Sequence, residues 1–183
     1  DLALKVGIEK ISAMANRFGL GIKHDLPLSS VAAGLAPTKQ WKQSARGADW
    51  VIGDTVNASI GQGFTLSSPL QLALMTARIA TNRIVTPRLI KSIDGIEQPS
   101  GAGDPLGISE NNIRKVRKGM QVVVNDRRGT AYRSRIIADD MRMAGKPGKS
   151  QVRNITAAER ARGVSRNEDL PWERRDHALF VAF

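Results

Sequence analysis

Cysteine is absent from the sequence, which excludes disulfides, thiolate nucleophiles and cysteine-ligated metal sites. Only two histidines are present, His24 and His177, and they are too few for a credible metal site. We therefore expect neither a metal ion nor a cofactor. No run of about eighteen apolar residues occurs, so no part of this sequence is expected to span a bilayer. Aromatic residues make up only 4%, and no stacking motif of a nucleic-acid-binding domain is found.

What the sequence does contain is positive charge. It has 28 Lys and Arg residues against 17 Asp and Glu, a net charge of +11 over 183 residues. Such an excess favours an anionic partner, whether nucleic acid, anionic lipid headgroups or an acidic polymer. Arg127 to Arg175 holds thirteen basic and six acidic residues, or +7 of the total. Hydrophobic residues make up 41%, enough for one globular domain with its own core.

Three helices are predicted from apolar periodicity and capping residues. The first covers residues 4–18 and is ended by a Gly-Leu-Gly run. The second covers residues 68–80 and begins with a serine cap followed by proline. The third covers residues 109–123 and also begins with serine. Four basic residues are expected on the solvent-facing side of the third helix: Arg114, Lys115, Arg117 and Lys118.

Strands are predicted later in the chain. Residues 84–93 have the composition of a strand, which Pro87 restricts to a sheet edge or a bend. Residues 94–107 are expected to form a loop. Residues 144–152 and 177–183 are predicted to be neighbouring strands of an antiparallel sheet. The insertion between them contains a short helix that begins with a Thr-x-x-Glu capping box.

Two stretches before the second helix are rich in turn residues. Residues 24–50 contain many prolines, glycines and serines and are predicted to be irregular, with Trp41 and Trp50 covering edges of the core. The run from Asn57 to Gly63 is predicted to form a tight loop before the capped helix. A phosphate cradle would fit that arrangement, but no Gly-Lys-Ser/Thr is present. We therefore favour a buried helix whose loop packs near a cleft.

The stretch from Ala144 to Val152 places a lysine between two glycines. Gly145 and Gly148 leave room for another group to approach the backbone, and Lys146 adds a positive charge there. A lysine in a Lys-x-Gly strand is one of three elements of a serine acyl-transfer site that penicillins also acylate. Two fixed residues are a weak motif, and a surface turn is the alternative.

Four short sequence runs, which include this stretch, occur in a fixed order along the chain. They are Ala58-Ser59-Ile60-Gly61-Gln62-Gly63, Ser68-Pro69-Leu70-Gln71-Leu72-Ala73, Ala144-Gly145-Lys146-Pro147-Gly148 and Arg175-Asp176-His177-Ala178-Leu179-Phe180. Together they resemble the transpeptidase domain of class B penicillin-binding proteins of the elongation type, the penicillin-binding protein 2 subfamily. The resemblance extends over essentially the whole chain, and residues 151–160 and 167–172 are also similar to that subfamily.

The resemblance implies an α+β fold (an α/β sandwich) of the penicillin-binding-protein and β-lactamase type. In that fold a five-stranded antiparallel sheet with helices on both sides lies beside an all-helical subdomain. Residues 1–183 would be a partial transpeptidase domain that holds sheet strands and part of the helical subdomain. The family's Ser-x-Asn motif is expected just before Asp1, and a last strand and C-terminal helix are expected after Phe183.

The resemblance also implies an activity. In the family, a serine of a Ser-x-x-Lys motif attacks the penultimate D-Ala of a peptidoglycan stem peptide, and the acyl group then passes to an amine of a neighbouring stem. β-Lactams acylate the same serine. The implied partners are stem peptides, β-lactams and a membrane glycosyltransferase of the elongation machinery. The implied location is the periplasmic face of the inner membrane.

Carried onto this chain, Lys146 would be the cleft lysine and Gly148 would allow close approach of the substrate. The N–H of Lys149 would donate to the oxyanion. Pro147 stands where the family has threonine, and Lys149 stands where it usually has threonine or serine. Pro147 has no N–H. The N–H of a threonine at this position would have pointed to the same edge as that of Lys149, where the ligand lies in the family.

The nucleophile itself is missing. No serine stands three positions before any lysine, so the chain contains no Ser-x-x-Lys and we expect no catalytic residue in it. The Ser-x-Asn at Ser165 to Asn167 follows Lys146, whereas the family motif precedes the lysine strand. We interpret it as part of a loop.

Three hypotheses follow. The chain is a fragment of a peptidoglycan D,D-transpeptidase that does not catalyse alone, or a non-catalytic relic or binding module that keeps a penicillin and peptidoglycan groove. The third hypothesis, a basic nucleic-acid-binding domain, depends on net charge alone. We expect no nucleic-acid partner.

Overall fold

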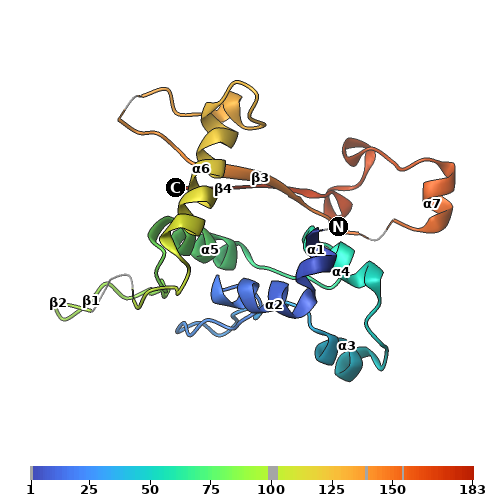
Figure 1. Ribbon diagram of the computed structural model, residues 1–183, viewed down its shortest axis with the longest axis horizontal. Coiled ribbons are helices and arrows are strands. Elements are labelled where there is room, and N and C mark those ends of the chain that lie inside the picture. Colours follow the sequence, from blue (N-terminus) through green and yellow to red (C-terminus); the bar gives the residue numbers. More distant parts are fainter. Residues whose placement is uncertain (1, 99–102, 139, 154) are drawn as a thin grey trace.

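The computed structural model describes residues 2–98, 103–138, 140–153 and 155–183. Its α-helices are α1 (Leu2–Val6), α2 (Ile8–Arg17), α3 (Lys39–Arg46), α4 (Ile52–Ser59), α5 (Pro69–Thr81), α6 (Glu110–Asn125) and α7 (Ala157–Arg162). Its strands are β1 (Ser92–Ile93), β2 (Ile96–Glu97), β3 (Gly145–Ser150) and β4 (His177–Ala182). Short 3-10 turns cover Tyr132–Ser134, Asn167–Asp169 and Trp172–Arg174. The helices α1 to α5 lie together, while α6 crosses to a long β3–β4 hairpin (Figure 1).

The predicted first helix is two helices. Gly7 has a φ of 80°, which breaks the helical path between α1 and α2 and which a residue with a side chain would adopt only with strain. The break lets Ile8 sit almost fully buried, with 2% of its surface exposed. Ser12 then donates a hydrogen bond of 2.8 Å to the carbonyl of Ala36. The apolar periodicity was the same on both sides of Gly7, so it did not reveal the break.

Helix α3 lies inside the stretch that was predicted to be irregular. Thr38 caps it by accepting a hydrogen bond from the N–H of Trp41, and Gly47 ends it in the left-handed conformation. Helix α4 was also missed, so the glycine-rich loop begins only at Ile60. Both tryptophans are half-buried and pack against Phe64, with ring centroids 5.1 Å away for Trp41 and 6.5 Å away for Trp50. This agrees with their predicted place at the edge of the core.

Helix α5 has the predicted start, with Ser68 as its cap and Pro69 as its first residue. Its residue Gln71 is fully buried. The Gln71 side chain donates to the carbonyls of Ile22 and Ala33 at 2.9 and 2.8 Å and accepts from the N–H of Ser68 at 3.0 Å. One amide thereby fastens the irregular segment before α3 to the start of α5.

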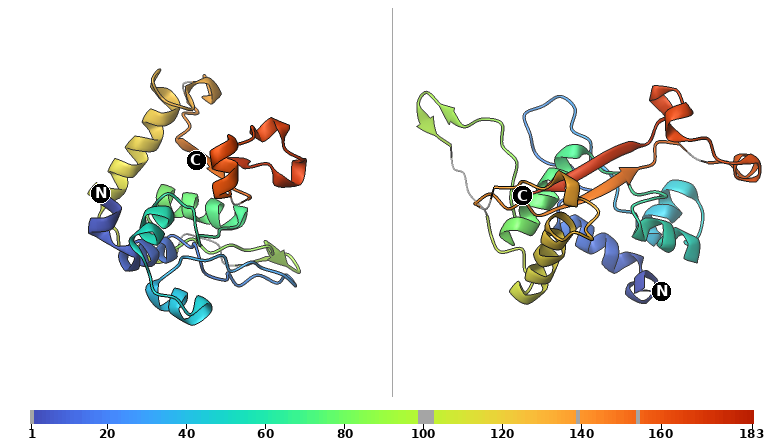
Figure 2. Two further views of the ribbon diagram at one scale, coloured as in Figure 1. Left: turned by 90° about the vertical axis from the view of Figure 1, so that its right-hand side faces the viewer. Right: turned by 90° about the horizontal axis from the view of Figure 1, so that it is seen from above.

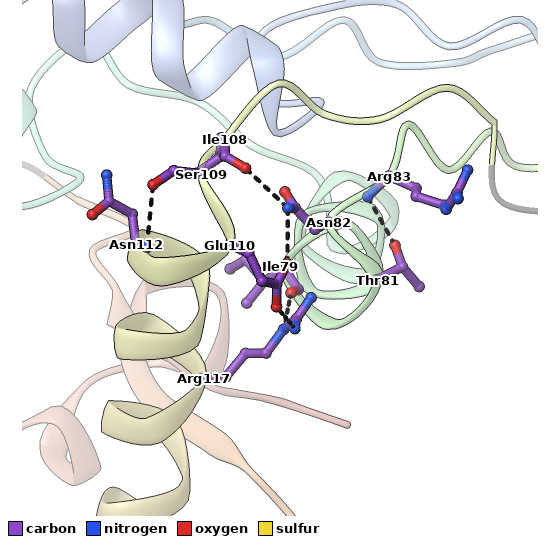
Figure 3. A network of polar contacts seen from close by, with 9 residues as sticks. All are labelled: Ile79, Thr81, Asn82, Arg83, Ile108, Ser109, Glu110, Asn112 and Arg117. Carbon is purple, nitrogen blue, oxygen red and sulfur yellow. Dashed lines mark hydrogen bonds and ion pairs between the residues drawn. The ribbon is translucent and has the colours of Figure 1, made fainter.

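Helix α6 begins after the Ser109 cap, as predicted. One of its four basic residues, however, faces α5 and not solvent. Arg117 was expected to face solvent. Instead its Nε donates to the carbonyl of Ile79 at 2.8 Å and its Nη1 pairs with Glu110 at 3.1 Å. Asn82 completes this contact by donating to Glu110 and to the carbonyl of Ile108 (Figure 3). The arginine is therefore part of the junction between α5 and α6, because the last carbonyls of a helix have no partner within it and that of Ile79 accepts from Arg117.

The strand predicted at residues 84–93 is mostly wrong. Only β1 at its end is a strand, and it pairs with β2 in a short antiparallel hairpin. The carbonyl of Val85 instead accepts hydrogen bonds from the buried guanidinium of Arg78, at 3.1 and 3.3 Å. Burial lowers the pKa of Arg78 from its ordinary value. In this stretch the backbone of Val85 therefore accepts hydrogen bonds from the buried Arg78 guanidinium and does not take part in a sheet.

The predicted pair of strands is confirmed, since β3 and β4 are antiparallel neighbours along their whole length. One face of this hairpin joins the main core. The buried members of that core are Ile79, Ile113, Met120 and Ala144, with Phe18, Met75, Ile108 and Val181 packed against them. An apolar groove of about 370 Å³ lies between α5 and the last residues of the chain, from Leu179 to Phe183.

The insertion between the strands contains the predicted short helix, α7. Thr156 accepts a hydrogen bond from the N–H of Glu159 at 3.2 Å, which is half of the expected capping box. The carboxylate of Glu159 pairs with Arg153 at 2.6 Å instead of returning to the cap. That ion pair links α7 to the segment that follows β3.

Candidate functional site

The backbone of β3 has one edge paired with β4 and one free edge. Ala144 and Phe183 exchange two hydrogen bonds, of 2.8 and 2.9 Å. In an antiparallel pair such bonded pairs alternate with non-bonded ones, so Lys146 and Gly148 bond to Val181 and Leu179 in the observed register. The backbone groups of the residues between them, at 147 and 149, point to the free edge.

This register explains why proline is tolerated within β3. Pro147 lacks an N–H, but its backbone faces the edge that β4 does not use, so no hydrogen bond of the hairpin is lost. Its carbonyl faces that edge and accepts a hydrogen bond from the Lys146 ammonium. Lys149 presents both an N–H and a carbonyl there. The free edge therefore presents one donor and two acceptors from these two residues, and Lys146 already bonds to one of the acceptors.

Replacing Pro147 with threonine should leave the hairpin intact. We expect Pro147→Thr to change the free energy of unfolding by no more than about 1 kcal/mol, mainly through the unfolded chain. In hydrogen–deuterium exchange, the amide introduced at position 147 should exchange fast, while those of Lys146 and Gly148 stay protected. Equal protection at all three positions would show that the register is different.

The two glycines of the stretch have different roles. A Cβ on Gly145 would lie 2.7 Å from the ring of Phe180 and 2.8 Å from the carbonyl of Val181, so packing requires glycine there. A Cβ on Gly148 would meet nothing within 4 Å. The described part of the chain thus gives no internal reason for glycine at 148, which fits a place where an external group approaches.

Lys146 brings its charge to the free edge. It lies on the same face of the hairpin as Val181, and its Nζ donates to the carbonyl of Pro147 at 2.7 Å. Lys149 lies on the opposite face and is exposed. Two ammonium groups therefore flank the edge from both faces. Arg153, a little further along, is already neutralised by Glu159, and their hydrogen bond lowers the pKa of that carboxyl.

A hollow continues from the end of β3. It has a volume of about 320 Å³ and lies between the glycine-rich turn and the residues that follow Lys149. Its lining is mostly polar and consists of Gly61, Gln62, Gly63, Thr65, Leu66, Ser67, Ser150, Gln151, Val152 and Arg153. The structure thus places the first of the four motifs beside the residues that follow the third, and the loop does lie near a cleft. Thr65 was not named in the sequence analysis, and Ser150 and Gln151 entered it only as members of longer stretches with no role of their own.

The loop between α7 and β4 is held by its own side chains. The Asn167 amide accepts from the N–H of Asp176 at 2.7 Å and donates to its carbonyl at 3.3 Å. The Asp176 carboxylate in turn accepts from the N–H of Val152 at 3.1 Å. These contacts give Asn167 a local structural role, in line with the interpretation of its Ser-x-Asn as part of a loop.

The histidines and helices add no further site. His24 is buried and bonds to the carbonyl of Gly19 at 2.8 Å, whereas His177 lies in β4. Within residues 2–98, 103–138, 140–153 and 155–183, no three metal-ligating side chains gather. No helix in those ranges has the length and apolar character needed to cross a bilayer.

Comparison with known proteins identifies the fold to which this hairpin belongs. The profile of the penicillin binding protein transpeptidase domain matches residues 1–171. The chain belongs to this family. Its α+β architecture is therefore part of the penicillin-binding transpeptidase fold, as the sequence motifs had predicted.

Curated members of the family are similar along the whole chain. The chain is 33% identical to the peptidoglycan D,D-transpeptidase MrdA of Haemophilus influenzae and 34% identical to that of Acinetobacter baumannii. Each alignment covers 100% of this chain, but only 28% and 27% of the relatives. The chain thus spans little more than a quarter of the length of these two family members.

Solved structures of the family superpose on the chain as well. The penicillin-binding protein PBP2 of Pseudomonas aeruginosa is 36% identical with a TM-score of 0.78, over 100% of this chain and 37% of that protein. PBP2 of Helicobacter pylori, solved in complex with MreC, is 31% identical with a TM-score of 0.78, over 100% and 30%. Similarity at this level places β3 and its neighbours within the family fold.

Proposed function

We propose that this chain forms one wall of the groove that holds peptidoglycan stem peptides in an elongation-type D,D-transpeptidase, and that it does not catalyse alone. The free edge of β3, flanked by Lys146 and Lys149, is the observation that carries the proposal. The family membership supplies the reaction, which is serine acyl transfer that cross-links stem peptides. The chain supplies binding groups for that reaction.

The edge of β3 suits an extended peptide that ends in a carboxylate. Such a peptide can bind as an added strand, because the N–H and carbonyl of Lys149 point to the edge that β4 does not use. Lys146 and Lys149 provide positive charge for the carboxylate. The N–H of Lys149 is one of the two donors that an oxyanion hole normally needs. Gly148 lets the ligand come close, since a side chain there would stand in otherwise open space.

The acylated serine belongs outside these 183 residues in this proposal, because the sequence contains no Ser-x-x-Lys. Residues 1–183 then form a partial transpeptidase domain that lacks the serine and Ser-x-Asn motifs and the last strand and helix. Lys149 makes the groove unusual, since a long cation replaces a small hydroxyl. It strengthens attraction of the carboxylate and narrows the space beside it.

The relatives support the setting of this activity. The H. pylori PBP2 was solved in complex with MreC, and another similar structure, at 28% identity and TM-score 0.65, is a peptidoglycan synthase complex that coordinates polymerization and crosslinking. We propose that the protein containing this chain acts in cell-wall elongation and cell shape, beside a membrane glycosyltransferase at the periplasmic face of the inner membrane. β-Lactams would enter the same groove.

A fluorescent penicillin tests the catalytic part of the proposal. We expect no covalent labelling of the 183-residue chain after denaturing electrophoresis, because no activated serine is present. A complete penicillin-binding protein of the family serves as the positive control. A stable labelled band on the chain would show that a nucleophile within these residues had been overlooked.

A further inference from the structure

A second region of the molecule has a chemistry that the peptide groove does not use. The end of α6 and the described residues after it, 126–138 and 140–143, lie at one end of the molecule, away from α1 to α4 (Figures 1 and 2). Residues 110–143 contain nine Lys and Arg against four Asp and Glu, a net charge of +5. Nearly half of the excess charge of the chain therefore lies in fewer than one fifth of its residues.

Most of these cations have no partner in the part of the chain that the structure describes. Glu110 forms an ion pair with Arg117 at 3.1 Å, and Asp126 forms one with Arg128 at 3.1 Å. The hydrogen bonds from Arg128 lower the pKa of Asp126 to about 2. The following side chains are exposed and have no ion-pair or hydrogen-bond partner among the residues with described positions: Arg114, Lys115, Lys118, Arg127, Arg133 and Arg142.

Large apolar side chains are exposed among them. Ile137 is 81% exposed, Met141 59%, Ile136 44% and Val122 43%. A hollow of about 260 Å³, lined by Lys118, Val122 and Arg142 among others, shows that α6 and the end of the segment lie side by side. We call the set Lys118, Val122, Arg127, Arg133, Ile136, Ile137, Met141 and Arg142 the basic tip.

Exposed cations around exposed isoleucines restrict what can cover this surface. A protein core would bury the guanidinium groups without partners, which is strongly unfavourable. Nucleic acid would satisfy the cations, but it offers little to Ile136 and Ile137, and the one tyrosine nearby, Tyr132, is already stacked under Arg135 at 3.8 Å. A membrane surface satisfies both kinds of side chain, since phosphates lie above the boundary of the hydrocarbon.

We propose that the basic tip is a docking surface for an anionic phospholipid membrane. The cations contact headgroup phosphates, while Ile137 and Met141 enter the boundary between headgroups and acyl chains. The contact is peripheral, because it uses exposed side chains of one helix end and one segment. It lies apart from the free edge of β3, so the proposal does not depend on the peptide groove.

Vesicle co-sedimentation of the 183-residue chain tests this directly. We expect binding to vesicles that contain phosphatidylglycerol and little binding to pure phosphatidylcholine. The binding should weaken strongly as salt rises from about 0.1 to about 1 M, because the Debye length falls from about 10 to about 3 Å. Equal binding to neutral vesicles, or no vesicle binding with tight binding to duplex DNA, would overturn the proposal.

Two sets of variants locate the contact. The triple variant Lys118→Gln, Arg133→Gln, Arg142→Gln should lower the partition coefficient about 100-fold, at about fivefold for each cation. The matched control neutralises three exposed cations elsewhere: Lys10→Gln, Arg46→Gln, Arg160→Gln. An equal loss in the control, or none in the first variant, would contradict the proposed surface.

The apolar part has its own pair of variants. Ile137→Asp should reduce vesicle binding at least tenfold, since an aspartate is repelled by anionic headgroups and does not enter the hydrocarbon boundary. Ile96→Asp is the control, because Ile96 is 71% exposed in the separate β1–β2 hairpin. Circular dichroism should show both variants folded, and a similar loss in both would reject a specific role for Ile137.

Discussion

Replacing Gln71 with leucine is expected to lower the free energy of unfolding by about 3 kcal/mol, because buried groups that lose a partner cost about 1–3 kcal/mol each. The Gln71 amide is fully buried and bonds to Ile22, Ala33 and Ser68. Leucine has a similar size but no polar atoms. Two carbonyls and one N–H would then lie in the interior without this partner. Denaturant unfolding followed by circular dichroism measures the change.

The surroundings of Gln71 make relaxation difficult. A Cβ on Gly34 would lie 2.6 Å from the Gln71 side-chain oxygen, so the backbone is packed directly against the amide. The control is Gln121→Leu, which changes an exposed glutamine of α6 and should alter stability by less than about 0.5 kcal/mol. If both variants unfold at the same denaturant concentration, Gln71 does not fasten the segment before α3 to α5.

Lys42→Met is the second substitution with a large expected effect. The ammonium of Lys42 bonds to Asp54 at 2.6 Å and to the carbonyl of Asp49 at 2.7 Å, and the two side chains are only 11% and 15% exposed. Removing one partner leaves the other charge poorly solvated, and breaking such a pair typically costs about 3 kcal/mol. The measurement is again the free energy of unfolding at neutral pH.

The chain contains a matched pair for comparison. Lys91 and Glu97 are 3.9 Å apart and 80% and 75% exposed, so Lys91→Met should cost less than about 0.5 kcal/mol. Equal effects of the two substitutions would mean that burial does not strengthen the Lys42 pair.

The Lys42 pair also predicts a pH dependence. Burial by itself raises the pKa of Asp54, but the hydrogen bonds from Lys42 and from the N–H of Val51, with the attraction of Lys42, outweigh it and hold the pKa below its usual 3.8. A carboxyl with a lowered pKa adds stability above 3.8 and loses it as the pH falls through the folded value. The cost of Lys42→Met should therefore shrink in acid. A cost that stays constant down to that range would exclude ionised Asp54 as the cause.

Local rules predicted the elements that depend on neighbouring residues. The Ser-Pro start of α5, the Ser109 cap of α6 and the pairing of β3 with β4 follow from caps, periodicity and strand composition. Helix α3 was not predicted, because its sequence has no apolar stripe. Its buried residue is Lys42, whose partner Asp54 lies twelve positions away in the chain. A helix held by a distant charge cannot be read from a local pattern.

The same limit applies to the errors around α5. Residues 84–93 looked like a strand because of their composition, but Arg78 uses the carbonyl of Val85. Arg117 looked like a surface residue because its neighbours are basic, yet it reaches the end of α5. In both cases a side chain binds a backbone carbonyl of another element. Such contacts depend on how the helices are arranged and leave no signal in a short stretch of sequence.

The strand at the candidate site and the family were more predictable than the fold around them. The Lys-x-Gly stretch indicated β3, and its neighbouring motifs gave the family. The sequence could not distinguish the two glycines, since only packing shows that Gly145 is needed by Phe180 while Gly148 faces open space. It also could not join the glycine-rich turn to the end of β3, because about ninety residues separate them in the chain.

The most direct test of the peptide groove is a titration of the isotope-labelled chain with a peptide that ends in D-Ala-D-Ala, followed by amide chemical shifts. We expect saturable shifts at Lys149 and Ser150, and slower hydrogen exchange of the Lys149 amide in the complex. Lys146→Met should weaken the peptide at least tenfold, whereas Lys10→Met should not. Saturable binding that leaves the Lys149 amide unchanged, or a Lys146→Met chain that binds as tightly as the original, would contradict a groove along β3.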